Sequence, residues 1–140
     1  MHHDPFLERA IEQAQKTLRG ELRAPVVHGF FHEPTFTASY VVHDSVTRHA
    51  AIVDSVLDLD QASGRTSTPF ADTMIAYVRQ HGLTVDWLLE THAHADHLSA
   101  APYLQEKLGG KLVIGRHILT VQEVFGKVFN EGDDFARDGS

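Results

Sequence analysis

The stretch Thr91-His92-Ala93-His94-Ala95-Asp96-His97 places three histidines and an aspartate within six residues. An apolar run over residues 83–90, expected to be a strand, comes directly before it. In an extended segment alternate side chains point the same way, so His92 and His94 can direct both imidazoles at one ion beyond the strand end. Asp96 and His97 can address the same pocket as the chain turns toward the next helix. We therefore predict a metal site made by His92, His94, Asp96 and His97.

Imidazole and carboxylate ligands suit zinc, iron or manganese, and such mixed ligation with open positions is typical of catalytic sites. A metal held in this way lowers the pKa of bound water or activates oxygen. The alternative, a polar loop with chance histidines, rarely places three histidines and an aspartate so close behind an apolar strand. Asp54, at the end of the apolar run 50–53, either holds a ligand histidine through a hydrogen bond or caps a loop.

The chain has eleven histidines, and most of them need no functional explanation. Those that stand apart from the cluster are expected to be surface or hydrogen-bonded structural residues. They are His28, His32, His43, His49, His81 and His117.

The spacing of apolar residues predicts the order of the elements. We expect helices over residues 5–19, with a start at Asp4-Pro5 and a stop at Gly20, and over 70–80, 99–108 and 120–128. Strands are expected over 27–31, 36–42 and 50–53, as an antiparallel meander, and over 83–90 and 111–114. Residues 57–68 are predicted to be a loop and the tail from Asn130 to be polar. This order indicates a layered α/β arrangement, preceded by a short amphipathic helix. We expect this helix to pack on the fold; a dimer contact and a removable arm are the alternatives.

Composition excludes several classes. The 140 residues, 42% of them hydrophobic, suit one compact domain. A net charge of -7 argues against nucleic acid as a partner. The absence of cysteine rules out disulfides and thiolate zinc sites. No apolar run approaches the roughly 20 residues of a membrane span, and no signal peptide is recognisable, so we expect a cytoplasmic protein.

The cluster matches the HxHxDH signature of the metallo-β-lactamase superfamily, whose fold is a four-layer αββα sandwich. Its flanks resemble bacterial persulfide dioxygenases, the sulfur dioxygenases of the ethylmalonic encephalopathy protein type, over about residues 25–140. The resemblance rests on segments 36–42 (FTASYVV), 52–57 (IVDSVL) and 97–104 (HLSAAPYL). Glyoxalase II proteins usually carry a Gly-Gly pair where this chain has Ser99-Ala100.

The resemblance implies a single Fe(II) that oxidises glutathione persulfide with O2, giving sulfite and glutathione in sulfide detoxification. It also implies that His92 is the iron ligand, while His94, Asp96 and His97 line the site; in two-metal relatives all four would bind zinc or another metal. We expect His92 and Asp96 to be the catalytic residues. Substrate-binding residues are not identified.

This family takes a second histidine from a downstream Gly-His-Thr-Pro segment and an aspartate further on, and neither occurs in the 140 residues. We therefore expect residues 23–140 to be the N-terminal half of a metallo-β-lactamase domain, with residues 1–22 as a helical extension. A longer chain or a partner chain would complete the site, and the apolar face of one sheet would be left uncovered.

Two rival interpretations stay open. One is a zinc-dependent thioester hydrolase of the glyoxalase II class, with one or two zinc ions. The other is a catalytically dead folding or interaction module. The expected partners are glutathione persulfide or a related thiol and O2, and a homodimer is not excluded by the sequence.

Overall fold

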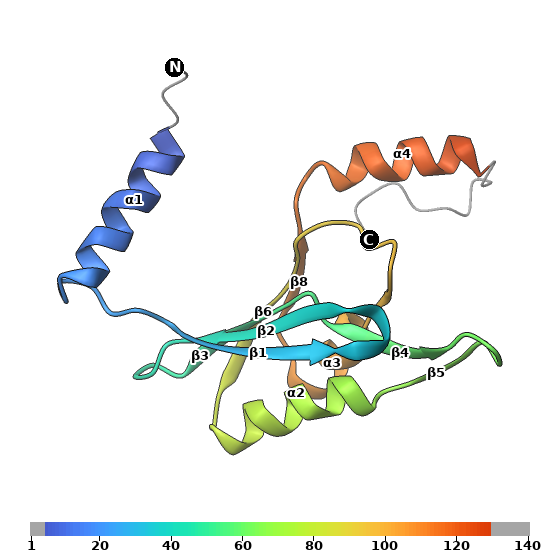
Figure 1. The fold of residues 1–140 in the computed structure, drawn as a ribbon, viewed down its shortest axis with the longest axis horizontal. Helices are drawn as coiled ribbons and strands as arrows, with labels where there is room; N and C mark the ends of the chain where they lie inside the picture. Colours follow the sequence, from blue (N-terminus) through green and yellow to red (C-terminus); the bar gives the residue numbers. More distant parts are fainter. Residues whose placement is uncertain (1–4, 130–140) are drawn as a thin grey trace.

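The computed structural model describes residues 5–129, which form two β-sheets and several helices (Figure 1). The larger sheet contains, in spatial order, β1 (Val26–His32), β2 (Thr37–His43), β3 (His49–Val53), β6 (Thr84–Glu90) and β8 (Lys111–Ile114). The smaller sheet contains β5 (Arg65–Ser67), β4 (Val56–Asp60) and β7 (Leu98–Ser99). The α-helices are α1 (Pro5–Leu18), α2 (Pro69–Gln80), α3 (Ala101–Leu108) and α4 (Ile118–Val128), and a short 3-10 helix, Glu33–Thr35, joins β1 to β2.

The strand pairing brings three strand ends to one edge of the larger sheet. β1, β2 and β3 form the predicted antiparallel meander, whereas β3 pairs with β6, and β6 with β8, in parallel. The carboxyl ends of parallel strands meet at the same edge, which is where open α/β sheets bind ligands. Asp54 follows β3, Thr91 follows β6 and Gly115 follows β8 at this edge.

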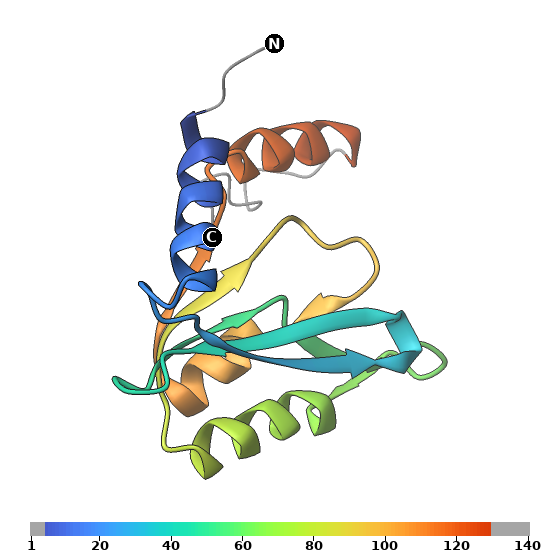
Figure 2. The same ribbon diagram turned by 60° about the vertical axis from the view of Figure 1, so that its left-hand side comes forward.

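One face of the larger sheet is covered by helices α2 and α3, which lie on the same side of it (Figure 2). Val41, Ile52 and Leu88 point into this layer and are almost fully buried. They meet an apolar stripe on α2 with helical spacing and the buried side of α3. The stripe consists of Ala71, Met74, Ile75 and Val78. The predicted layered α/β class is confirmed.

The opposite face of the sheet, called the open face below, carries apolar side chains that remain exposed in the part of the chain that the structure describes. Strand register places Phe31 opposite Ala38, Tyr40 opposite Val53, and Trp87 opposite Ala51 on this face. The exposed fractions are 58% for Phe31, 40% for Tyr40 and 45% for Trp87. The prediction that one sheet face would be uncovered is therefore met within residues 5–129.

The predicted loop over residues 57–68 is wrong, because most of it forms β4 and β5. Val56 is buried and the neighbouring strand β7 pairs with it, which turns a polar segment into the centre of a small sheet. The loop-like residues occupy only the turn of the hairpin, where the amide of Gly64 donates to the carbonyl of Asp60 at 2.8 Å and Gly64 has a φ of 69°.

Helix α1 forms where the sequence predicts it, but none of its described residues is buried. The expected packing of this helix on the fold is therefore wrong for the chain as described, and Phe6 and Leu18 are more than four-fifths exposed. The predicted helix start at Asp4 and the polar tail from Asn130 lie outside the described residues. Within residues 5–129 no helix is long and apolar enough to cross a membrane.

Candidate metal centre

His94 is held between two carboxylates that come from the ends of adjacent parallel strands. Its Nε2 lies 3.0 Å from Oδ1 of Asp54 and 3.0 Å from Oε2 of Glu90. Because both carboxylates accept, Nε2 carries a hydrogen, and in the neutral ring the lone pair is on Nδ1. Nδ1 faces Asp96, with Oδ1 at 3.9 Å. A metal-binding histidine commonly donates its other N–H to a carboxylate in this way.

Both carboxylates are fixed by further donors. Asp54 accepts from the amide and the hydroxyl of Thr91, each at 2.7 Å, and Glu90 accepts from the hydroxyl of Ser99 at 2.6 Å. Burial raises the pKa of Asp54, but the hydrogen bonds from Thr91 and His94 outweigh burial, so this pKa lies below its usual value. Asp54 therefore stays ionised as the acceptor for His94.

Asp54 has a left-handed backbone conformation, with a φ of 51°. Non-glycine residues seldom adopt this region, although aspartate tolerates it better than most, and such residues cluster at functional sites. The turn lets the amide of Asp54 donate to the carbonyl of Leu89 at 2.9 Å while its side chain points toward Thr91 and His94. The conformation thus ties the end of β3 to the end of β6.

Asp96 and His97 lie beside each other at the base of the same loop. Nδ1 of His97 is 3.4 Å from Oδ2 of Asp96, and the hydroxyl of Thr37 lies 3.2 Å from that same oxygen. The amide of Asp96 itself, together with His97, holds the pKa of the Asp96 carboxyl below its usual value. Asp96 is half-exposed, whereas the side chain of His97 is only 1% exposed.

The residues present fit a transition-metal ion. Nε2 of His97 is buried and has no hydrogen-bond partner, although buried polar atoms are nearly always paired. One ligand atom each from His94, Asp96 and His97 lie within 4.8 Å of one another. A second group, formed by Asp54, Glu90 and His94, also meets this limit. We favour the first group, because the carboxylates of the second are already engaged by Thr91 and Ser99.

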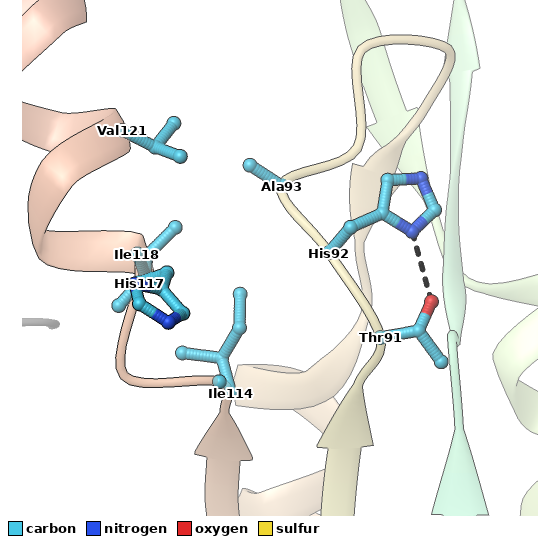
Figure 3. A pocket seen from close by; sticks show the side chains of 8 residues that line it. Thr91, His92, Ala93, Ile114, His117, Ile118 and Val121 are labelled. Atoms are coloured by element: carbon cyan, nitrogen blue, oxygen red, sulfur yellow. Dashed lines mark hydrogen bonds between the residues drawn. The ribbon is translucent and has the colours of Figure 1, made fainter. Parts of the chain in front are cut away.

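His92 stands apart from both groups. Its ring centre is 4.2 Å from that of His94, but its Nδ1 lies 2.8 Å from the hydroxyl of Thr91, and the residue is exposed. Figure 3 shows the His92 ring turned away from Ile118 and Val121 on α4, which line the far side of a cavity of about 260 Å³. The structure thus brings together three of the four predicted ligands and leaves His92 beside them.

Several residues of the site were not predicted. Glu90 precedes the motif and lies four residues before His94, a spacing that could have suggested a contact had the motif been helical. Ser99 and Thr37 gave no signal as site residues in the sequence. Among the histidines expected to be surface or structural, His32 hydrogen-bonds to Asp58 and His49 to Asp86, as predicted for hydrogen-bonded structural residues.

A histidine and aspartate cluster at the carboxyl edge of a sheet backed by helices defines a layered α/β protein with a candidate metal site at that edge. The family model described as the metallo-beta-lactamase superfamily matches residues 32–137. The chain therefore belongs to the metallo-β-lactamase superfamily.

Known proteins agree with this assignment. A probable metallo-hydrolase of Burkholderia pseudomallei (strain 1710b) is 58% identical over 114 residues, which are 81% of this chain and 39% of the relative. Glyoxylase B2 of Dictyostelium discoideum is 44% identical over 105 residues, 74% of this chain and 36% of the relative. The crystal structure of ETHE1 from Myxococcus xanthus superposes with a TM-score of 0.51 at 28% identity, over 62% of this chain and 34% of that one. The chain thus spans well under half the length of these relatives.

Proposed function

We propose that this chain supplies the HxHxDH half of a non-haem Fe(II) persulfide dioxygenase. The observation that carries the proposal is the combination of the flanking sequence, which resembles that enzyme class, with the structural likeness to ETHE1 of Myxococcus xanthus at 28% identity. Ser99-Ala100 also departs from the Gly-Gly pair usual in glyoxalase II.

The proposed reaction takes one glutathione persulfide, one O2 and one water to glutathione, sulfite and two protons. The outer sulfur of the persulfide leaves its S–S bond as sulfite, and the persulfide gives four electrons to O2. When bound, the iron supplies the oxygen-activating chemistry of this class. For this chain, the substrate, the use of O2 and the identity of the metal are all proposed.

The chain's own residues have defined tasks in this proposal. Asp54 and Glu90 fix the His94 ring so that its Nδ1 lone pair faces Asp96. His97 presents a buried, unpaired Nε2. His92 is the iron ligand by family resemblance. To bind iron it would leave the hydroxyl of Thr91 and rotate its ring. An exposed side chain has the rotamer freedom for such a rotation.

The test is oxygen consumption with glutathione persulfide, measured on the product of the complete coding sequence loaded with Fe(II). We expect uptake of one O2 per sulfite formed, and its loss in His92→Ala. The matched control is His49→Ala, since His49 pairs with Asp86 of β6 and lies at the start of β3, at the opposite end from the site. Iron-loaded protein that takes up no oxygen with this substrate would sink the proposal.

A zinc-dependent thioesterase of the glyoxalase II class is the second candidate. The observation in its favour is the 44% identity to Dictyostelium glyoxylase B2. Metal analysis and hydrolysis of S-lactoylglutathione separate the two candidates. Bound zinc with thioester turnover, and no oxygen uptake, would decide for the thioesterase.

A further inference from the structure

A line of hydrogen-bonded side chains leads from the start of α2 to the candidate metal centre. The amide of Phe70, in the first turn of α2, donates to Oδ2 of Asp58 at 2.9 Å, and Oδ1 of Asp58 lies 3.2 Å from Nε2 of His32. Nδ1 of His32 lies 2.7 Å from the hydroxyl of Thr35, which lies 2.8 Å from the hydroxyl of Thr37. Each link is within hydrogen-bond distance.

The line ends on two of the predicted metal ligands. The Thr37 hydroxyl lies 3.2 Å from Oδ2 of Asp96 and 3.4 Å from Nδ1 of His97. His32, Thr35 and Thr37 are called the His32 line below.

The backbone explains why these three residues meet. His32 at the end of β1 is directly opposite Thr37 at the start of β2, so their side chains lie on the same face. Thr35 lies in the 3-10 helix between the two strands, and Phe36 closes the turn with a φ of 54°. The turn therefore places the Thr35 hydroxyl between His32 and Thr37. His32 is 5% exposed and Thr37 9% exposed. Both pair with the Thr35 hydroxyl that lies between them, as expected for buried polar atoms.

Hydrogen accounting shows what the line does for His97. If Nε2 of His97 carried the ring hydrogen, it would be a buried donor with no partner, which is costly. The hydrogen therefore sits on Nδ1, where Thr37 and Asp96 can accept it, and Nε2 keeps its lone pair. Thr37 donates its one hydrogen to Oδ2 of Asp96, and its two lone pairs can accept from Nδ1 of His97 and from the hydroxyl of Thr35.

We infer that the His32 line is a positioning device, in which His32 acts through Thr35 and Thr37 to hold the Asp96 carboxylate and the Nδ1-protonated His97 ring in place for metal binding. Its purpose rests on the proposed metal function, but the hold on His97 is a property of the chain without metal. Metal binding through Nε2 requires this tautomer.

The first experiment needs no metal. Nitrogen-15 spectra of the histidine rings, recorded above the range where imidazoles titrate, should show His97 as one tautomer with hydrogen on Nδ1 in the wild type. Thr37→Val removes the hydroxyl at constant shape, so we expect the His97 signals to shift toward a mixture of tautomers. Thr37→Ser restores the hydroxyl and should restore the signals. Thr66→Val, at an exposed threonine of β5, is the matched control and should change nothing.

The second experiment tests whether His32 acts through the hydroxyls. His32→Phe and Thr35→Val should each disturb the His97 tautomer, and both should weaken cobalt(II) binding by about 10-fold, the lower end of what lost outer partners of metal ligands cost. Circular dichroism checks that each variant folds. If Thr37→Val does not fold, Thr35→Val, which removes the next hydroxyl of the line, tests the inference in its place.

Unchanged His97 signals in folded Thr37→Val and His32→Phe would overturn the inference, whatever the metal results. If the product of the complete coding sequence binds no cobalt(II) while the His97 signals still depend on Thr37, the metal function is refuted and the positioning stands. The two proposals therefore fail by different measurements.

Discussion

Glu90 and Asp54 both accept from the Nε2–H of His94, and the second carboxylate oxygen of Glu90 accepts from the hydroxyl of Ser99. A carboxylate on the far nitrogen of a metal-binding histidine fixes the ring and makes the lone pair on the near nitrogen more basic. Glu90 is 9% exposed, so water does not readily replace it. The residue therefore bears on metal affinity without being one of the ligands we favour.

We predict that Glu90→Gln weakens metal binding by roughly 10-fold to 100-fold, because the amide keeps the shape but loses the charge that orients His94. The measurement is a competition titration of cobalt(II) or zinc against a chelator. Glu106→Gln, at an exposed glutamate of α3 paired with Lys107, is the matched control and should bind as the wild type does. Equal affinity in both variants would remove Glu90 from the site.

The residues of the site differ in how far the sequence reveals them. The HxHxDH segment is visible because four candidate ligands, three histidines and an aspartate, lie within six residues, and Asp54 because it ends an apolar strand. Glu90, Ser99 and Thr37 are invisible, since their contacts depend on how β6, β7 and β2 are placed in space. The backbone strain at Asp54 likewise has no signature in the sequence, because it follows from the hydrogen bond that its amide donates to Leu89 across the sheet.

At the level of elements, the turn between β2 and β3 depends on Asp44. Its Oδ1 accepts from the amides of Val46 at 2.7 Å and Thr47 at 2.8 Å, which closes the turn before Arg48 adopts a φ of 61°. The hydrogen bond from Thr47, followed by that from Val46, lowers the pKa of Asp44 below its usual value of 3.8. The Asp44 carboxylate thus supplies the acceptor that these two turn amides would find in a neighbouring strand if they lay in the sheet.

We predict a pH-dependent contribution from this turn. Because the folded pKa of Asp44 is lower than 3.8, its stabilisation is fully present above 3.8 and is lost as the pH falls through the folded pKa. Asp44→Asn keeps an acceptor oxygen but does not titrate. The difference in melting temperature between wild type and Asp44→Asn should therefore shrink in acid, and a difference that stays constant below pH 3.8 would contradict this account.

The centre of the sheet offers a test of packing. Leu88 on β6 is 1% exposed and lies in the layer formed with α2 and α3. We predict that Leu88→Ala lowers the free energy of unfolding by about 2 to 5 kcal/mol, through lost burial and the cavity left behind. Leu59 on β4 has 44% of its surface exposed, so Leu59→Ala should change the free energy of unfolding by no more than about 0.5 kcal/mol. Urea unfolding measures both, and equal costs would place Leu88 outside the core.

Most elements follow from periodicity, and the misses have physical causes. Helix α2 and strand β6 carry clear apolar spacing, so the sequence locates them within a residue or two. β4 and β5 were missed because their alternation is short and their acidic and hydroxyl residues are typical of loops. β7 has only two residues, Leu98 and Ser99, and exists because Val56 and Leu57 offer it a partner.

At the scale of the whole molecule, as far as residues 5–129 describe it, one face of the larger sheet is packed and the other is open. Helices α2 and α3 bury the first face, while the open face leaves Phe31, Tyr40 and Trp87 each at least 40% exposed. A net charge of -7 makes copies of the chain repel one another in solution, but it does not remove the free-energy cost of exposing the apolar surface to water. Exposed apolar patches of this kind mark surfaces that bind other apolar groups.

The open face should therefore bind the apolar dye ANS, and Trp87 reports where the dye sits because it is the chain's only tryptophan. Energy transfer from Trp87 to bound dye selects dye molecules on its own face. We predict strong transfer in the wild type and at least a halving in Phe31→Ser/Tyr40→Ser, since each change removes an aromatic ring from the apolar surface, about 150 Å² or more of contact area when such a ring is buried. Leu59→Ser, which exposes no new surface on that face, should leave the transfer unchanged.

Weak transfer in the wild type at high dilution would mean that the face is covered. Dye bound without transfer would mean that the dye binds another exposed surface, such as helix α1.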